Sequence, residues 1–313
     1  MKRFFAALLA LFSSVTFGTT LVPVQLLNPT GSTTGQTIVS TGASSAPGWA
    51  TVPLSGLSSV AANTVIANAT SASAAPTAFS MPSCSGAANV LQWTTSSGFT
   101  CGTGVTGRLL AVQVFSSSGT YTPTSGTTKT IVTVQAPGGG SGGAATTTSA
   151  QTSFGEAGAG GSYAQALWTS PTSQTVTIGA VGTAGASGGA GGAGGTTSVG
   201  SVVSCPGGTA GTAGTTFSTV PAIIGPVAGP AACTVSGATT LVSIPGGRGP
   251  IQVALSTGVG VNQFGGASAM GFGTFGAGGN YGVGGAGSFN AASSSAGAGF
   301  TGGAAIVIFY DYQ

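Results

Sequence analysis

A glycine falls at every third position from residue 179 to residue 194. The same spacing returns over residues 155–161, 208–214 and 273–285. A polyproline-II-like chain has three residues per turn, so this spacing places glycines on one face, where a neighbouring backbone leaves no room for a side chain. Short β-branched segments alternate with these runs, and no proline framework accompanies them. The pattern therefore predicts ordered, glycine-packed segments within a β-scaffold and leaves strand and polyproline-II geometry open for each run.

The composition also favours an ordered chain. Glycine accounts for 59 of the 313 residues, charged residues make up only 2% and hydrophobic residues 41%. Disordered chains usually combine high net charge with low hydrophobicity, and this chain has neither property. A monomer with so few charges would be poorly soluble. We therefore expect the chain to belong to an assembly or to be stiffened by backbone hydrogen bonds.

The side-chain inventory argues against catalysis. The chain has no histidine and two carboxylates, Glu156 and Asp311, which lie far apart in the sequence. Acid–base catalysis and hydrolytic metal sites depend mostly on these residue types, so we expect no enzyme, no metal site and no cofactor. A Ser–Lys pair through Lys129 is the remaining alternative to a solvated strand lysine. The net charge of +3 includes Lys2 and Arg3 and leaves no basic patch for nucleic acid.

Residues 1–18 have the pattern of an export signal. Lys2 and Arg3 precede an apolar run over residues 4–12, and the small residues Thr16 and Gly18 suit cleavage after Gly18. The apolar run is too short to span a bilayer. A buried N-terminal anchor is the alternative interpretation.

Four cysteines form two pairs that are local in the sequence, Cys84 with Cys101 and Cys205 with Cys233. An even number suits an oxidising compartment, and neither spacing is that of a zinc site. We expect both pairs to be disulfides, each contributing about 3 kcal/mol by restricting the unfolded chain. Four buried free thiols are the alternative.

Residues 19–107 are expected to form a fibre stalk or attachment region, because residues 28–107 contain a weak repeat. Each unit has a β-branched run, a turn of small residues and an aromatic return, at residues 37–49, 64–79 and 89–99. This pattern predicts three β-hairpins. Because a single hairpin cannot bury a core, association of three copies around an axis would stabilise them.

From residue 108 onward the sequence predicts longer strands and no helix. The expected strands are 110–115, 128–135, 163–168, 174–178, 197–203, 239–244, 251–255 and 304–312. Alternation over residues 130–134 indicates one buried face, and the continuous apolar run 305–309 indicates a central strand. The predicted fold class is therefore all-β: a β-hairpin repeat stalk, then a β-sandwich or jelly-roll-like domain over residues 108–313 with the Gly-x-x runs as long projecting loops.

Several of these segments, taken in order, resemble the glycine-rich domain at the tips of bacteriophage tail fibres. They are residues 114–121, 131–134, 137–140, 160–164, 175–179 and 302–308, and the stalk segment 35–49 resembles phage tail-protein repeats. The resemblance covers residues 108–313. It implies a homotrimeric virion protein of the tail, whose N-terminal region binds other tail or baseplate proteins and whose distal loops bind a host-surface receptor during adsorption. The alternative is a secreted glycine-rich structural protein of the bacterial surface or matrix, which explains the export-like N-terminus better.

The candidate receptor-binding surface lies mainly between residues 261 and 290, where aromatic and amide side chains alternate with glycine. Aromatic rings supply contact area at low entropic cost, and amides form adaptable hydrogen bonds, which suits a glycan or an outer-membrane protein loop. The candidate residues are Asn262, Gln263, Phe264, Phe272, Phe275, Asn280, Tyr281, Phe289 and Asn290. The alternative is that these aromatics cap glycine layers inside the tip.

Arg248 joins this candidate set as the only charged residue between Glu156 and Asp311. Its expected role is contact with an anionic sugar or phosphate, and the alternative is an exposed turn residue.

Overall fold

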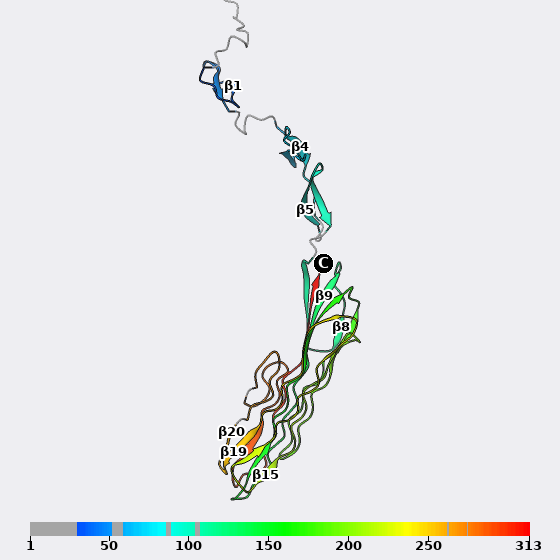
Figure 1. The fold of residues 1–313 in the computed structure, drawn as a ribbon, viewed down its shortest axis with the longest axis vertical. Helices are drawn as coiled ribbons and strands as arrows, with labels where there is room; N and C mark the ends of the chain where they lie inside the picture. The colour runs from blue at the N-terminus through cyan, green and yellow to red at the C-terminus, as the bar shows by residue number, and fades with distance from the viewer. Residues whose placement is uncertain (1–29, 52–58, 86–88, 104–106, 262, 274) are drawn as a thin grey trace, which may run out of the picture. The chain divides into compact units, whose positions relative to one another are not determined.

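The computed structural model describes residues 30–51, 59–85, 89–103, 107–261, 263–273 and 275–313 (Figure 1). In these ranges the chain forms strands, turns and irregular segments but no helix, so the predicted all-β class is confirmed. No helix in the described ranges is therefore long and apolar enough to cross a membrane. The chain divides into two compact units, Met1–Met81 with Thr95–Gly98 and Pro82–Thr94 with Phe99–Gln313. The export-like segment, residues 1–18, lies outside the described residues.

The first unit contains two of the three expected hairpins. Strand β1 (Thr37–Val39) pairs with β2 (Gly48–Ala50), and β3 (Thr64–Ala67) pairs with β4 (Thr77–Ser80), both antiparallel. In the second turn the Asn68 side chain donates to the carbonyl of Ala72 and accepts from the amide of Thr70. This bonding is typical of an asparagine that closes a turn.

The third expected hairpin is also present, formed by β5 (Asn89–Thr94) and β6 (Gly98–Thr103). The rings of Trp93 and Phe99 meet edge to face, with centroids 5.0 Å apart. The Cys84–Cys101 disulfide joins β6 to the chain before β5, as expected from the sequence.

Two five-stranded antiparallel sheets follow and are consistent with the expected β-sandwich. In spatial order the first sheet contains β18 (Thr239–Ile244), β11 (Tyr163–Thr169), β9 (Lys129–Gln135), β22 (Ile306–Tyr312) and β7 (Leu109–Phe115). The second contains β17 (Thr234–Val235), β14 (Val203–Cys205), β13 (Thr197–Val199), β12 (Gln174–Thr177) and β8 (Gly119–Tyr121). Side chains of both sheets form one buried core, whose aromatic members include Tyr121, Trp168 and Phe309.

One expected strand of this region is wrong. Residues 197–203 form a hairpin of β13 and β14 instead of a continuous strand. The chain reverses there because Gly200 has a φ of 46°, in the left-handed region that glycine enters at little cost. The apolar run at 305–309 does lie in an internal strand, since β22 has a neighbour on each side.

The sandwich core holds one carboxylate, Asp311. It is buried and accepts hydrogen bonds from the hydroxyl of Tyr121 at 2.6 Å, Thr130 Oγ1 at 2.8 Å and Thr124 Oγ1 at 2.8 Å. Burial opposes ionisation, but these hydrogen bonds, first of all that from Tyr121, outweigh it and lower the pKa of Asp311 below its ordinary value. Burial and the bond to Asp311 raise the pKa of Tyr121. The pair therefore remains a carboxylate and a neutral phenol at neutral pH.

Two smaller sheets lie at the other end of the glycine-rich region from the sandwich (Figure 1). One has the order β15 (Thr215–Phe217), β10 (Thr152–Gly155) and β21 (Ser288–Asn290). The other has the order β16 (Ala222–Ile224), β19 (Gln252–Ser256) and β20 (Val259–Val261). Both contribute to a second, smaller core around Phe154.

Glycine-rich segments run between the sandwich and these small sheets, and the segment 136–144 is buried at their centre. Its amides at residues 138, 139 and 140 donate to the carbonyls of Gly303, Ala159 and Gly192. One turn later the amides at 141, 142 and 143 donate to Phe300, Glu156 and Gly189 of the same three segments. The neighbours thus recur every three residues, which is the period of polyproline II and not the two-residue period of a strand.

The carbonyls of this central segment complete its surroundings. They accept from the amides of Gly182, Gly208 and Gly285, each in a further segment. The segment therefore has glycine-rich neighbours on every side, and the runs pack into a bundle rather than project as separate loops. Backbone groups that would need water in a loop are satisfied here by neighbouring segments.

Close approach, rather than unusual dihedral angles, explains the glycines of the central segment. A Cβ built on Gly138, Gly139 or Gly140 would lie 1.9–2.0 Å from a backbone oxygen of another segment. The three-residue pattern at 179–194 has the same cause at Gly182 and Gly191, where a Cβ would lie 2.2 Å from the amide nitrogen and 2.4 Å from the carbonyl oxygen of Gly140. Any side chain would push such neighbours apart.

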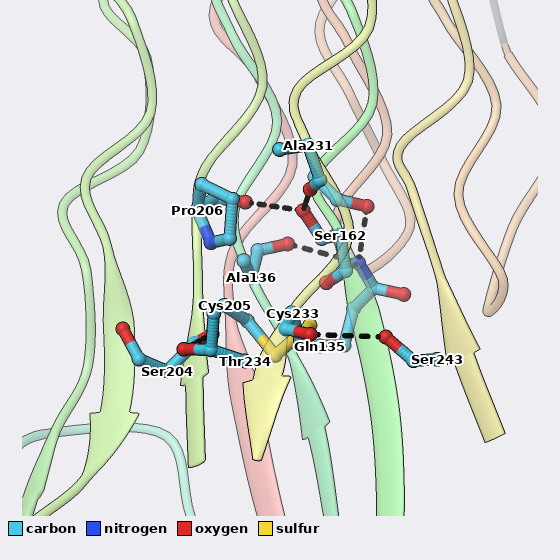
Figure 2. The surroundings of a disulfide bond; sticks show 11 residues. Gln135, Ala136, Ser162, Ser204, Cys205, Pro206, Ala231, Cys233, Thr234 and Ser243 are labelled. Carbon is cyan, nitrogen blue, oxygen red and sulfur yellow. Dashed lines mark hydrogen bonds between the residues drawn. A yellow bond between two sulfur atoms is a disulfide. The ribbon is translucent and has the colours of Figure 1, made fainter. Parts of the chain in front are cut away.

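The disulfide between Cys205 and Cys233 lies where the strands give way to the glycine segments (Figure 2). Beside it Ser162 Oγ lies 2.8 Å from the carbonyl oxygens of Pro206 and Ala231, and Gln135 Nε2 donates to Gly161 at 2.9 Å. These contacts tie together the segments that leave β14, β9 and β11. Both expected disulfides are confirmed, and they indicate an extracellular or secreted protein.

Candidate binding surface

The segment from Gln263 to Tyr281, described apart from residue 274 and called the aromatic loop below, leaves the glycine bundle and returns to it. Near its start Gly266 donates to the carbonyl of Gly158 at 2.8 Å and accepts from the amide of Gly284 at 2.9 Å. Near its end Gly278 donates to Thr301 at 2.9 Å. Both ends of the loop are therefore fixed to the rigid part of the unit.

Aromatic rings are exposed on this loop. Phe272 is 85% exposed and Phe275 67%, and Phe264 and Tyr281 are exposed as well. The rings of Phe264 and Phe275 lie against each other, with centroids 4.1 Å apart. Single exposed apolar side chains need no explanation, but a group of exposed rings on one segment is typical of an interaction site.

Two hollows adjoin these rings. One, of about 490 Å³, is lined by Ser268, Ala269, Met270, Gly271, Phe272, Gly273 and Asn280. The other, of about 390 Å³, is lined by Met270, Gly278, Gly279, Asn280, Tyr281 and Ala304. Met270 and Asn280 line both, so the hollows are neighbours. The Ser268 hydroxyl donates to the carbonyl of Tyr281 at 2.6 Å, which fixes the two sides of the loop.

The other predicted site residues fall into two groups. Arg248 is exposed, and the amide of the preceding Gly247 donates to Ala267 at 3.0 Å, so the segment of Arg248 lies beside the start of the aromatic loop. Gln263 is half-buried next to Phe264 in the chain. Asn262 lies outside the described residues.

The structure does not bring Phe289 and Asn290 to the aromatic loop. Both belong to strand β21, where the ring of Phe289 packs against Phe154 with centroids 5.0 Å apart. The Asn290 side chain donates to the carbonyls of Ala145 and Ser295 at 3.0 and 2.7 Å. Their contacts support the scaffold beneath the small sheets.

An exposed aliphatic face on the sheet of β16, β19 and β20 was not expected from the sequence. Ile223 is 66% exposed, and Val253 pairs with both Ile223 and Val261 across the sheet. Strand β19 does alternate along the chain, but its buried positions are Gln252 and Ala254, and the larger apolar side chains lie on the other face. A reading that places apolar residues inside assigns the opposite face.

The chain matches no protein-family model, and comparison with curated proteins finds no similar sequence.

Proposed function

We propose that this chain is the receptor-binding protein at the tip of a bacteriophage tail fibre, related to the glycine-rich tip domains that it resembles, and that its aromatic loop contacts a receptor on the host surface. The observation that carries the proposal is the group of exposed rings, Phe264, Phe272, Phe275 and Tyr281, on a loop fixed at both ends. Recognition surfaces are commonly built from such loops on a rigid scaffold.

The chemistry of the loop supports a contact surface rather than a reaction centre. Rings offer large areas with few rotatable bonds, and the amide of Asn280 beside both hollows offers hydrogen bonds to sugar hydroxyls or to a peptide backbone. Arg248, in the neighbouring segment, adds a positive charge for an acidic sugar or a phosphate. The receptor under this proposal is a glycan or a loop of an outer-membrane protein.

The remaining parts of the chain then take the roles expected of a fibre protein. The protein forms a homotrimer in the virion, the hairpins of residues 19–107 form its stalk, and the N-terminal region attaches to other tail or baseplate proteins. The two disulfides support the extracellular part of this proposal, because such bonds persist outside the cytosol.

Phage adsorption tests the proposal. A phage carrying Phe272→Ser/Phe275→Ser should adsorb at least about tenfold more slowly than wild type, because each lost ring removes about 1 kcal/mol or more of contact energy. Val181→Ser, at an exposed apolar side chain outside both the stalk and the aromatic loop, is the control and should adsorb normally. Equal adsorption of both variants would show that the loop does not bind the receptor.

A secreted structural protein of the bacterial surface is the second candidate. It is favoured by the export-like pattern of Lys2, Arg3 and the apolar run after them, together with the two disulfides. Mass spectrometry of purified particles separates the two functions: a fibre protein is found in virions at fixed stoichiometry, whereas a surface protein is found on cells or in the medium of uninfected cultures.

A further inference from the structure

The first sheet of the sandwich has apolar side chains on both faces. Its inner face holds Val132, Val134 and Phe309 in the core. On its outer face, Tyr310 pairs with Val112 on one side and with Ile131 on the other, and Ile131 pairs with Leu167. A sheet that faces water on one side normally alternates apolar and polar residues. This sheet does not.

The next row of the outer face also has apolar side chains, on either side of a polar pair. Ile308 pairs with Val114, and beyond the central Thr133 and Gln165 the row ends at Val242. Gln165 Nε2 donates to Thr133 Oγ1 at 3.3 Å, so these two polar side chains are bonded to each other. Val114 is 58% exposed, and Val112 and Val242 are exposed too. We call this surface of β7, β22, β9, β11 and β18 the outer face.

We propose that a second copy of this chain packs on the outer face. This pairing of two copies goes beyond the threefold association proposed for the stalk and is independent of the aromatic loop. Two flat apolar sheet faces can pack on each other about 10 Å apart, as the layers of a sandwich do. Each copy therefore offers the other a surface of the same shape and chemistry.

The area of the outer face is sufficient for such an interface. Five strands about 4.8 Å apart, over residues 307–312 at about 3.4 Å each, give about 24 by 20 Å, or about 480 Å² per copy. Two copies then bury about 1,000 Å², the lower limit expected of a specific interface. A patch of this size is within the range of the largest exposed patch of a soluble monomer, which is often functional.

The distribution of charge also fits a second copy. Asp311 points into the core, and Lys129, at the start of β9, is exposed at the margin of the outer face. The two rows of the outer face described above contain no charged residue, so two copies bring no like charges together at the centre. A strongly charged partner would leave its charges unpaired against this surface.

Light scattering on the purified full-length chain, from roughly 1 to 100 µM, tests the proposal. We expect the wild-type chain to have the mass of a dimer, because each outer face is covered by one other. Val112→Lys/Val114→Lys places two ammonium groups in the interface and should raise the dissociation constant at least about 100-fold. In the monomer these side chains point to solvent from an edge strand, so the fold should tolerate the change.

The matched control is Ile223→Lys/Leu255→Lys, which makes the same change at exposed positions of the small distal sheet and should assemble as wild type does. Thermal unfolding checks that both variants are folded, and Tyr310→Ser gives a milder change on the outer face should the first variant fail to fold.

A wild-type monomer at all concentrations, or equal assembly of the outer-face and control variants, would overturn the proposal. A failure here leaves the adsorption result of the aromatic loop unaffected, so the two proposals are separable.

Discussion

The hydroxyl of Tyr121 on β8 donates to Asp311 on β22 over 2.6 Å, and so links the two sheets of the sandwich through a buried carboxylate. The ring of Tyr121 also stacks on Phe309, two residues before Asp311, with centroids 3.8 Å apart. One phenol thus satisfies a buried charge and fills the core beside it. A carboxylate in this position stabilises the fold only while its donors remain in place.

Asp311→Asn should lower the free energy of unfolding by about 2–3 kcal/mol, because the neutral amide accepts weaker hydrogen bonds and directs an N–H group at donors. Denaturant unfolding followed by tryptophan fluorescence, to which the core residue Trp168 contributes, measures the loss. Glu156→Gln is the control, since Glu156 accepts only a long bond of 3.3 Å from the amide of Thr212 through its side chain. A loss for Asp311→Asn no larger than for Glu156→Gln would contradict this role of Asp311.

Acid should destabilise the protein through the same group. The folded state lowers the pKa of Asp311 below its ordinary value of 3.8, so its stabilising effect is present above that pH and is lost as the pH falls through the folded-state pKa. Thermal unfolding between about pH 5 and pH 2 should show this decline in the wild type and a shallower one in Asp311→Asn. Parallel curves for the two proteins would rule out the mechanism.

Gly140→Ala should be far more damaging than alanine at an open glycine. Its Cβ would lie 1.9 Å from the carbonyl oxygen of Thr183, so segments of the bundle must separate, at a cost of about 3 kcal/mol or more. Gly225→Ala is the matched control, because a Cβ there has no atom within 4 Å and the position lacks a positive φ. We expect Gly225→Ala to change stability by less than about 1 kcal/mol. Similar unfolding midpoints for both variants would contradict a close-packed bundle.

Removing the disulfide at the base of the bundle should lower stability by about 2–4 kcal/mol. The change is Cys205→Ser/Cys233→Ser, and calorimetry reads the main unfolding transition. Cys84→Ser/Cys101→Ser removes the bond of the third hairpin and should leave that transition nearly unchanged, because it closes a loop outside the sandwich and the bundle. The reverse order of the two effects would show that the bundle does not depend on Cys205–Cys233.

The sequence was sufficient for the features that depend on local pattern. Alternation and β-branched runs located most sandwich strands, and the spacing of the cysteines indicated both disulfides. The turn at Gly200 could not be predicted in this way. The β-branched residues around Gly200 favour a continuous strand, and its left-handed φ is visible only in the structure. Local pattern therefore located the strands better than it located the turns between them.

The bundle and the binding surface could be predicted only in part. The three-residue spacing marked segments that need close neighbours, but which segments meet depends on pairings between distant residues, such as Gly139 with Ala159 and Gly285. The aromatic content of residues 261–290 singled out Phe272 and Phe275, which are exposed, together with Phe289, whose partner Phe154 comes from a distant strand. Composition reports which side chains are present and not which of them find partners.

Direct binding of the purified protein to host cells tests the central claim that the aromatic loop contacts the receptor. The wild-type chain should bind saturably and block adsorption of the phage, and Phe272→Ser/Phe275→Ser should weaken binding at least about 30-fold, the equivalent of about 2 kcal/mol. Binding by the variant with the affinity of the wild type would contradict the account.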